Sequence, residues 1–168
     1  MNWSDFSSDL LPKPVLRMVI DARISSVTDC GTTPQGQCSN YVIGGGSFIA
    51  KDPAGKETHG EVMAGGADYF LERPDGVGVL NAMYSLKTAQ GQVFNIHNRG
   101  LYVSTEQGRA LEADGVWPLP EGTYQSRCTP EFTAGKGEMA WLNNCVFTGV
   151  VSYPSAENVI IHIYELVE

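Results

Sequence analysis

The sequence is poor in charged side chains, and most of those it has are acidic. Only 18% of its 168 residues are Asp, Glu, Lys or Arg, and the formal net charge at pH 7 is −8. No cluster of lysines and arginines offsets this excess, so phosphate backbones and anionic membrane surfaces would be repelled. We therefore expect neither a nucleic acid nor a membrane as a partner.

Long hydrophobic runs are also missing. No apolar segment approaches the roughly 20 residues that a membrane-spanning helix needs. The first residues, MNWSDFSSDLLPKPV, have neither the basic region nor the apolar run of a secretory signal. These absences predict a cytoplasmic protein, and the chain length fits a single domain with its own core.

Cysteine and histidine are few, and their spacing is not that of metal ligands. The four cysteines, Cys30, Cys38, Cys128 and Cys145, form no C-x-x-C pair, and the three histidines follow no metal-binding pattern. We therefore predict no metal. Four reduced thiols are expected in a cytoplasmic chain, with Cys145 buried in the middle of a strand. The alternative is a disulfide, either Cys30–Cys38 or Cys128–Cys145.

The motifs of several large enzyme classes are absent. There is no G-x-S-x-G sequence, no phosphate-binding loop and no dinucleotide fingerprint. The run Gly44-Gly45-Gly46 lacks the lysine and the helix that would make it a phosphate site. Hydrolase, kinase and dehydrogenase functions are disfavoured, and we expect no cofactor.

Alternation of apolar and polar residues dominates what remains. No stretch has the 3.6-residue period and caps of an ordinary amphipathic helix, whereas 19 glycines punctuate short alternating segments. We predict an all-β protein, a single antiparallel β-barrel of about 8–10 strands with an interior pocket, over residues 14–168. Residues 1–13, with Pro12, are predicted to be an N-terminal arm. The predicted strands are 15–24, 41–43, 47–50, 59–63, 67–72, 77–88, 92–98, 122–132, 141–153 and 158–167.

Two segments interrupt this pattern in ways that suggest function. Gly44-Gly45-Gly46, inside a strand pattern, predicts a bulge, a sharp bend or the close approach of a ligand. Residues 108–121 are the longest stretch without periodicity and contain Trp117. A loop of this length in a compact domain commonly serves as a lid.

A set of spaced motifs resembles a known family. The chain is similar, from about residue 15 to residue 167, to the domain-of-unknown-function 3237 family. The motifs are Thr33-Pro34-x-Gly36, Gly44-Gly45-Gly46-Ser47-Phe48, Gly60-Glu61-Val62, Gly65-Gly66-Ala67-Asp68, Arg73-Pro74-Asp75-Gly76, Asn98-Arg99-Gly100 and Ala140-Trp141-Leu142-Asn143.

The resemblance implies a small antiparallel β-barrel but little chemistry, because most of that family is uncharacterised. Similar small barrels include allene oxide cyclases, dirigent-type proteins and several pericyclases, which guide a reactive intermediate; that link is an analogy between folds. The chain departs from a common family pattern in residues 108–121, at His97 and at Met83. These departures fit a changed or more apolar pocket.

Asp68 and Arg99 are the leading catalytic candidates. Asp68 follows a glycine pair, and a carboxylate half-buried in a barrel mouth would have a raised pKa suited to general acid–base catalysis. Alternatively, Asp68 bonds backbone amides at the bend. Arg99 would hold a ligand oxygen, or else pair with Asp68 or Glu61 as a structural brace.

His97 is the third catalytic candidate, because it shares a strand face with Arg99. If that face lines the cavity, His97 could move protons near neutral pH; the opposite face carries Phe94, Ile96 and Asn98. An exposed, non-functional His97 is the other interpretation. The candidate substrate-binding residues are Glu61, Tyr84, Asn98, Trp117, Trp141 and Asn143.

These features lead to one main hypothesis. The protein would be a cofactor-independent cyclase, isomerase or lyase acting on an apolar natural-product intermediate, for example by a Diels–Alder cycloaddition. The alternative is a non-catalytic barrel that binds a small molecule. A barrel that serves as an oligomer scaffold ranks third, and a homodimer is one expected form.

Overall fold

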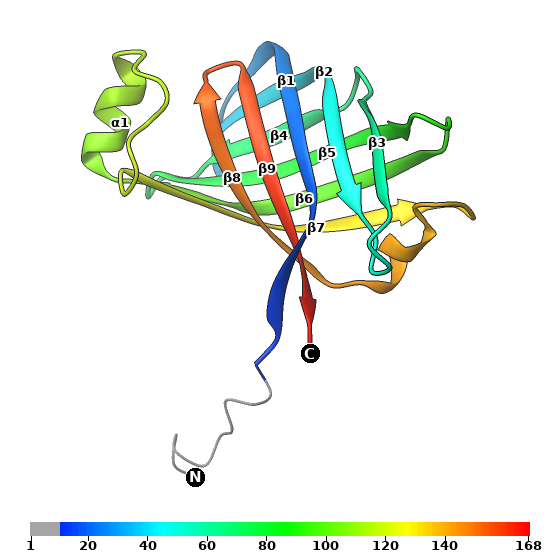
Figure 1. The fold of residues 1–168 in the computed structure, drawn as a ribbon. Helices are drawn as coiled ribbons and strands as arrows, with labels where there is room; N and C mark the ends of the chain where they lie inside the picture. The colour runs from blue at the N-terminus through cyan, green and yellow to red at the C-terminus, as the bar shows by residue number, and fades with distance from the viewer. Residues whose placement is uncertain (1–10) are drawn as a thin grey trace.

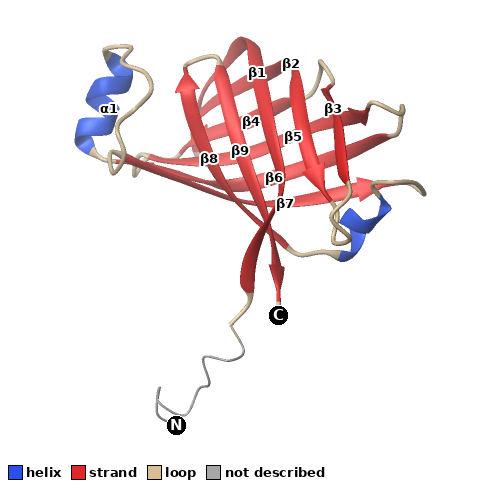
Figure 2. Ribbon diagram, in the orientation of Figure 1, coloured by secondary structure: helices blue, strands red, loops and turns tan. Residues whose placement is uncertain are grey.

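The computed structural model describes residues 11–168, which form a β-barrel of nine antiparallel strands (Figure 1). Two short helices lie at opposite ends of this barrel (Figure 2). The predicted fold class is thus confirmed. The elements are β1 (Lys13–Thr33), β2 (Gly36–Lys51), β3 (Glu57–Val62), β4 (Ala67–Glu72), β5 (Val77–Thr88), β6 (Val93–Ser104), α1 (Glu106–Ala113), β7 (Tyr124–Ala134), the 3₁₀ helix η3 (Ala140–Asn144), β8 (Phe147–Ser155) and β9 (Asn158–Val167).

The sheet closes on itself because β2 bonds to β1 on one edge and to two strands on the other. The first half of β2 pairs with β4 and its second half with β3, and both of these pair with β5. The ring continues from β5 through β6, β7, β8 and β9 back to β1. The shortest ladder is β7–β8, which comprises Arg127 with Val150 and Cys128 with Gly149.

The glycine run is the bend that lets β2 serve both partners. β2 leaves β4 after Val42 and joins β3 at Gly46, while the opposing β1 register shifts between Arg23 and Ser26. Gly46 has a φ of 143°, and a Cβ there would collide with the carbonyl oxygen of Asp21. Of the three outcomes predicted for this run, the structure has the bulged bend.

Inward-facing residues divide the barrel interior into a filled half and a hollow half. In the filled half, Phe94 contacts Phe48 and Phe132 with ring centroids 5.5 and 6.2 Å apart, and Phe132 contacts Phe147 at 5.3 Å. Leu86 and Ile163 beside them are completely buried. Close packing of large side chains leaves no space here for a ligand.

The segment after β7 differs from the prediction. Residues 141–146 are not the start of a strand: η3 closes the filled end, and β8 begins at Phe147. Cys145 consequently follows η3 and is only partly buried, so the prediction of a buried mid-strand cysteine is wrong. All four cysteines carry free thiols.

The two chain ends of the barrel lie side by side. Lys13 at the start of β1 pairs with Val167 at the end of β9, and both strands leave the barrel together in Figure 1. β1 begins where the predicted arm ends, and residues 1–10 of that arm lie outside the described residues. Within residues 11–168, neither length nor apolar character makes any helix a candidate for crossing a membrane.

The steric account of the bend predicts different costs at neighbouring glycines. Gly45 and Gly46 both have positive φ, but a Cβ at Gly45 would meet its nearest atom at an ordinary 3.7 Å. Gly46→Ala should therefore lower the free energy of unfolding by about 1–3 kcal/mol more than Gly45→Ala. Urea denaturation of the two variants measures this difference, and equal losses would contradict it.

Candidate functional site

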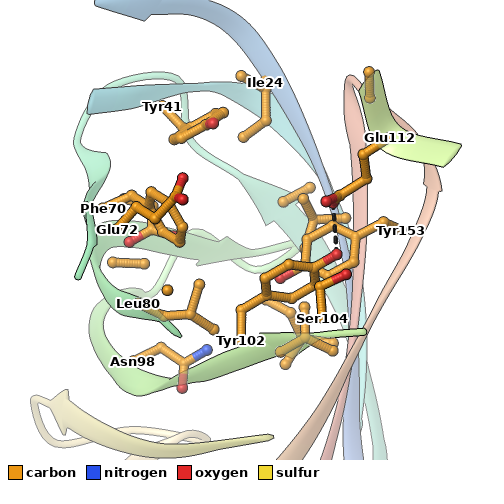
Figure 3. Close-up of a pocket in the computed structure, with 18 of the residues that line it drawn as sticks. Ile24, Tyr41, Phe70, Glu72, Leu80, Asn98, Tyr102, Ser104, Glu112 and Tyr153 are labelled. Carbon is orange, nitrogen blue, oxygen red and sulfur yellow. Dashed lines mark hydrogen bonds between the residues drawn. The ribbon is translucent and has the colours of Figure 1, made fainter. Parts of the chain in front are cut away.

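The hollow half of the barrel is a pocket of about 390 Å³, which we call the barrel pocket (Figure 3). Strands from around the ring line its wall, and α1 with the loop after it lies at its mouth. The volume is sufficient for a small organic molecule. The interior pocket predicted from the sequence is therefore present.

Small residues at inward positions create this hollow. Gly78 and Ala82 alternate with Leu80 and Tyr84 along the inner face of β5, and Ala22 occupies the corresponding face of β1. A Cβ at Gly78 would collide with the Phe70 ring. The hollow thus depends on inward side chains that are too short to reach across the barrel.

Asp68 lies in the wall of the barrel pocket and has one backbone partner. Tyr41, Asp68, Ala82 and Asn98 form a cross-strand row from β2 to β6, so their side chains share the inner face. The β4–β5 ladder is interrupted after Asp68, and the Asn81 N–H donates instead to Asp68 Oδ1 at 2.7 Å. The bend between β3 and β4 therefore points a carboxylate inwards.

Burial raises the pKa of Asp68 to about 6, and the hydrogen bond from Asn81 opposes that rise only in part. A carboxyl group with such a pKa exchanges protons readily near neutral pH. Burial, with the nearby Asp68 charge as a smaller cause, also raises the pKa of Tyr41. The expected raised pKa of Asp68 is present, with burial as its main cause.

Two polar side-chain atoms in the barrel pocket have no hydrogen-bond partner among the described residues. Tyr84 is 6% exposed and Asn98 is 3% exposed, yet neither Tyr84 Oη nor Asn98 Oδ1 makes a hydrogen bond within residues 11–168. An unpaired buried polar group costs about 1–3 kcal/mol, so such groups are usually satisfied. Both residues line the barrel pocket, and their unpaired atoms have almost no surface exposed to solvent.

Helix α1 closes one side of the pocket mouth. Thr105 caps the helix by accepting a hydrogen bond from Gly108 N at 3.0 Å. Gly108 packs so closely that a Cβ would collide with the carbonyl oxygen of Thr123. The Tyr102 hydroxyl donates to Glu112 Oε1 at 2.5 Å, which fastens the helix to β6 (Figure 3).

Residues 108–121 are therefore not a simple loop, as predicted, but a helix followed by a loop. The predicted cover over the mouth is nevertheless found, since Trp117 lines the barrel pocket and lies 6.5 Å from the Tyr153 ring. The missed signal is Thr105 followed by Glu106, an N-cap with an acidic first turn. Gly108, a poor helix former, obscured it.

Two of the three predicted catalytic residues lie outside the barrel pocket. Arg99 faces outwards, has a 56% exposed side chain, and pairs with Glu131 at 2.7 Å rather than with Asp68 or Glu61. His97 shares this outer face, where its Nε2 lies 2.8 Å from Asn81 Oδ1. The hypothesis that their strand face lines the cavity is wrong, because the opposite face carries the buried residues of β6.

Three predicted substrate-binding residues also lie elsewhere. Glu61 is exposed and forms an ion pair with Lys87 at 3.3 Å. Trp141 packs on Phe147 at the filled end, and Asn143 there donates to the Ala134 carbonyl at 2.8 Å. By contrast, Tyr84, Asn98 and Trp117 line the pocket as predicted.

Several lining residues were not singled out from the sequence, although strand alternation could have located some of them. Tyr102 and Ser104 continue the inward face that starts with Phe94 and Ile96. The lining residues that come from the hairpin ends and from α1 show no alternation pattern that would have placed them in the pocket. The missed residues with polar or aromatic side chains are Tyr41, Phe70, Glu72, Tyr102, Ser104, Arg109, Glu112, Tyr153 and Ser155.

The described part of the chain contains no cluster of three or more histidine, cysteine or acidic side chains with the geometry of a metal site. The pocket instead offers one enclosed carboxyl group, a phenol without a hydrogen-bond partner among the described residues and a buried amide. Such groups can bind, orient and exchange protons with an organic ligand.

The raised pKa of Asp68 predicts a pH-dependent effect on stability. Its pKa rises from an unfolded value near 3.8 to about 6, so the folded state binds its proton more tightly, and stability falls between these two values as pH increases. Asp68→Asn, which keeps an acceptor for Asn81 N–H, should increase the free energy of unfolding by about 1–3 kcal/mol at pH 8. Near pH 4 the increase should vanish, and urea unfolding at both pH values checks this.

The Tyr84 hydroxyl, which has no partner among the described residues, predicts a difference in stability between two Tyr→Phe variants. Tyr84→Phe removes a hydroxyl without a partner and should leave the ligand-free protein equally stable or more stable by up to about 1 kcal/mol. Tyr153→Phe is the matched control, because the Tyr153 hydroxyl lies 3.2 Å from Ser126 Oγ. That variant should lose about 1 kcal/mol. Thermal unfolding distinguishes the two, and a larger loss for Tyr84→Phe would argue against a free hydroxyl.

Sequence comparisons find related proteins of unknown function. A family model described as "Protein of unknown function (DUF3237)" matches residues 12–166. A UPF0311 protein of Rhodopseudomonas palustris is 28% identical over 148 residues, covering 88% of this chain and 92% of the relative. A UPF0311 protein of Clostridium acetobutylicum is 27% identical over 119 residues, covering 71% and 74%.

Solved structures show the same fold. A conserved protein of unknown function from Rhodopseudomonas palustris superposes with a TM-score of 0.83 at 25% identity, covering 93% of this chain and 98% of that one. A β-barrel-like protein from Acinetobacter baumannii gives 0.73 at 24%, covering 92% and 94%. An enzyme from Penicillium herquei gives 0.62 at 14%, covering 94% and 98%. Since the family model spans nearly all of the described chain, the protein belongs to the DUF3237 family.

Proposed function

We propose that the protein is a cofactor-independent enzyme, a cyclase, isomerase or lyase, that acts on an apolar small molecule in the barrel pocket. The observation that carries this proposal is Asp68, a carboxyl group with a pKa near 6 inside a largely apolar hollow. Enzymes use such displaced pKa values for acid–base chemistry. The structural neighbour described as an enzyme supports a catalytic use of this fold, at 14% identity.

The roles follow from the positions of the groups. Asp68 accepts a proton from carbon or oxygen of the substrate and returns it at another atom. The Tyr84 hydroxyl, which has no partner among the described residues, donates to the substrate oxygen that gains negative charge. Trp117 at the mouth limits the access of water.

Conformational control is the second part of this mechanism. A rigid barrel that holds a flexible, conjugated substrate folded can lower the barrier to ring closure without supplying a nucleophile. A Diels–Alder cycloaddition of a natural-product intermediate is one concrete version, in which Tyr84 polarises the dienophile and Asp68 transfers no proton. His97 and Arg99 have no direct part in it, because they face outwards.

The catalytic competence of Asp68 can be tested without the natural substrate. We expect the protein to accelerate exchange of the α-protons of β-tetralone, an apolar ketone, in deuterated buffer, and NMR measures this exchange. The rate should increase as Asp68 ionises around pH 6. Asp68→Asn should lower it by about 10²-fold or more, the usual contribution of a general base.

The control variant is Arg99→Ala, which alters a charged residue of the outer face and should leave the exchange rate unchanged. Binding of β-tetralone is followed separately by quenching of tryptophan fluorescence. If the ketone binds but exchanges at the same rate with wild type and with Asp68→Asn at every pH, the acid–base role of Asp68 is wrong and the pocket binds this ligand without proton transfer.

A further inference from the structure

The barrel pocket carries more negative than positive charge. Asp68, Glu72 and Glu112 line it, together with a single cationic side chain, Arg109. With the three carboxylates ionised, the formal charge of the lining is −2. This surplus has a consequence for the ligand, because fields inside a partly enclosed site are less screened than at an open surface.

These carboxylates are not neutralised within the fold. None of the three lies within 4 Å of a lysine, arginine or histidine nitrogen in residues 11–168, although seven such pairs occur elsewhere on the molecule. Arg109 and Glu72 are both exposed, Glu112 is partly buried, and Arg109 Nη1 donates to the Ser104 carbonyl at 2.8 Å. Glu112 accepts from the Tyr102 hydroxyl, which is uncharged.

Aromatic rings stand beside the two glutamates. Glu72 lies near Phe70, whose ring is 5.7 Å from that of Tyr41, on one side of the hollow (Figure 3). Glu112 lies on the opposite side, near Tyr102 and Tyr153, whose rings are 5.6 Å apart. Aromatic faces attract cations through their quadrupoles, and carboxylates add a full charge.

Asp68, which also lines the pocket, favours the same kind of ligand. When ionised, its carboxylate can only accept hydrogen bonds. A ligand that pairs with it must carry a hydrogen-bond donor. An anionic ligand would bring further acceptors into a negatively charged pocket, at a cost in free energy.

We propose that the mouth of the barrel pocket, with Glu72 on one side and Glu112 on the other, selects a ligand that carries an ammonium group, so that the otherwise apolar substrate is an amine. This inference rests on the proposed function, since it takes the barrel pocket as the ligand site. It specifies that the substrate carries a positive charge. A carboxylate of the same shape would be rejected. The opposite preference would have been expected if Arg99 had faced the pocket.

Three probes on one aromatic scaffold test the charge preference: naphthylethylamine, naphthylethanol and naphthylpropanoate. Isothermal titration calorimetry with the full-length protein at pH 7 and low salt gives their dissociation constants. We expect the amine to bind about tenfold or more tightly than the alcohol, and the carboxylate to bind most weakly. Added salt should weaken the amine but not the alcohol.

Charge-neutral variants locate the ammonium site. Glu72→Gln and Glu112→Gln should each reduce the affinity for the amine by about three- to tenfold while leaving the alcohol within about twofold. Glu106→Gln is the matched control: it removes the same charge from α1 at a position outside the pocket lining, and should leave both affinities unchanged. Unfolding temperatures verify that each variant is folded.

Three outcomes overturn this inference: the alcohol or carboxylate binds as tightly as the amine, none of the probes binds, or Glu106→Gln weakens the amine as much as the pocket variants do. The proposed catalytic function is tested independently, because exchange at β-tetralone requires no ammonium group. Exchange without amine selectivity would remove the charge assignment alone, and amine selectivity without exchange would leave an amine-binding barrel.

Discussion

The barrel depends on one strand that must satisfy two partners along the same edge. β2 bonds to β1 continuously, while β4 and β3 share its other edge in succession. The change of partner requires a bend that residues with a Cβ accommodate poorly, and glycine removes that obstacle. Closure of the ring follows from this bend, since β3 and β4 then both reach β5. The turn from β3 into β4 at the same place directs Asp68 inwards.

The same sheet encloses both a tightly packed core and an open pocket. Large apolar residues at the η3 end provide the cohesion that a domain of this size requires, and small residues at the α1 end leave the interior open. The hollow end contains groups that a fully packed core would exclude: a carboxyl group with a raised pKa and two polar atoms without partners. Close packing at one end thus allows the other end to remain hollow.

Strand alternation alone predicted the fold class and the inward faces of β1 and β5. It could not show that 41–43 and 47–50 are one strand, because the continuity of β2 arises from pairing with β1, which is distant in sequence. For β6 the two faces were separated correctly, but charge and motif drew attention to His97 and Arg99. The apolar face, with Phe94 and Ile96, was the better guide to the interior, and it placed Asn98 correctly. The glutamates of the mouth come from a hairpin end and a helix whose positions only tertiary packing determines.

The adjacent ends of β1 and β9 have a practical consequence. Both leave the barrel at the filled end, whereas the later part of β1, at Ile24, and the early part of β9, at Val159, contribute to the pocket wall. A second domain, an affinity tag or a surface linker attached next to either of these strand ends would therefore lie at the filled end, away from the pocket mouth. If the protein is immobilised or fused in this way, the mouth of the barrel pocket would remain open to solvent.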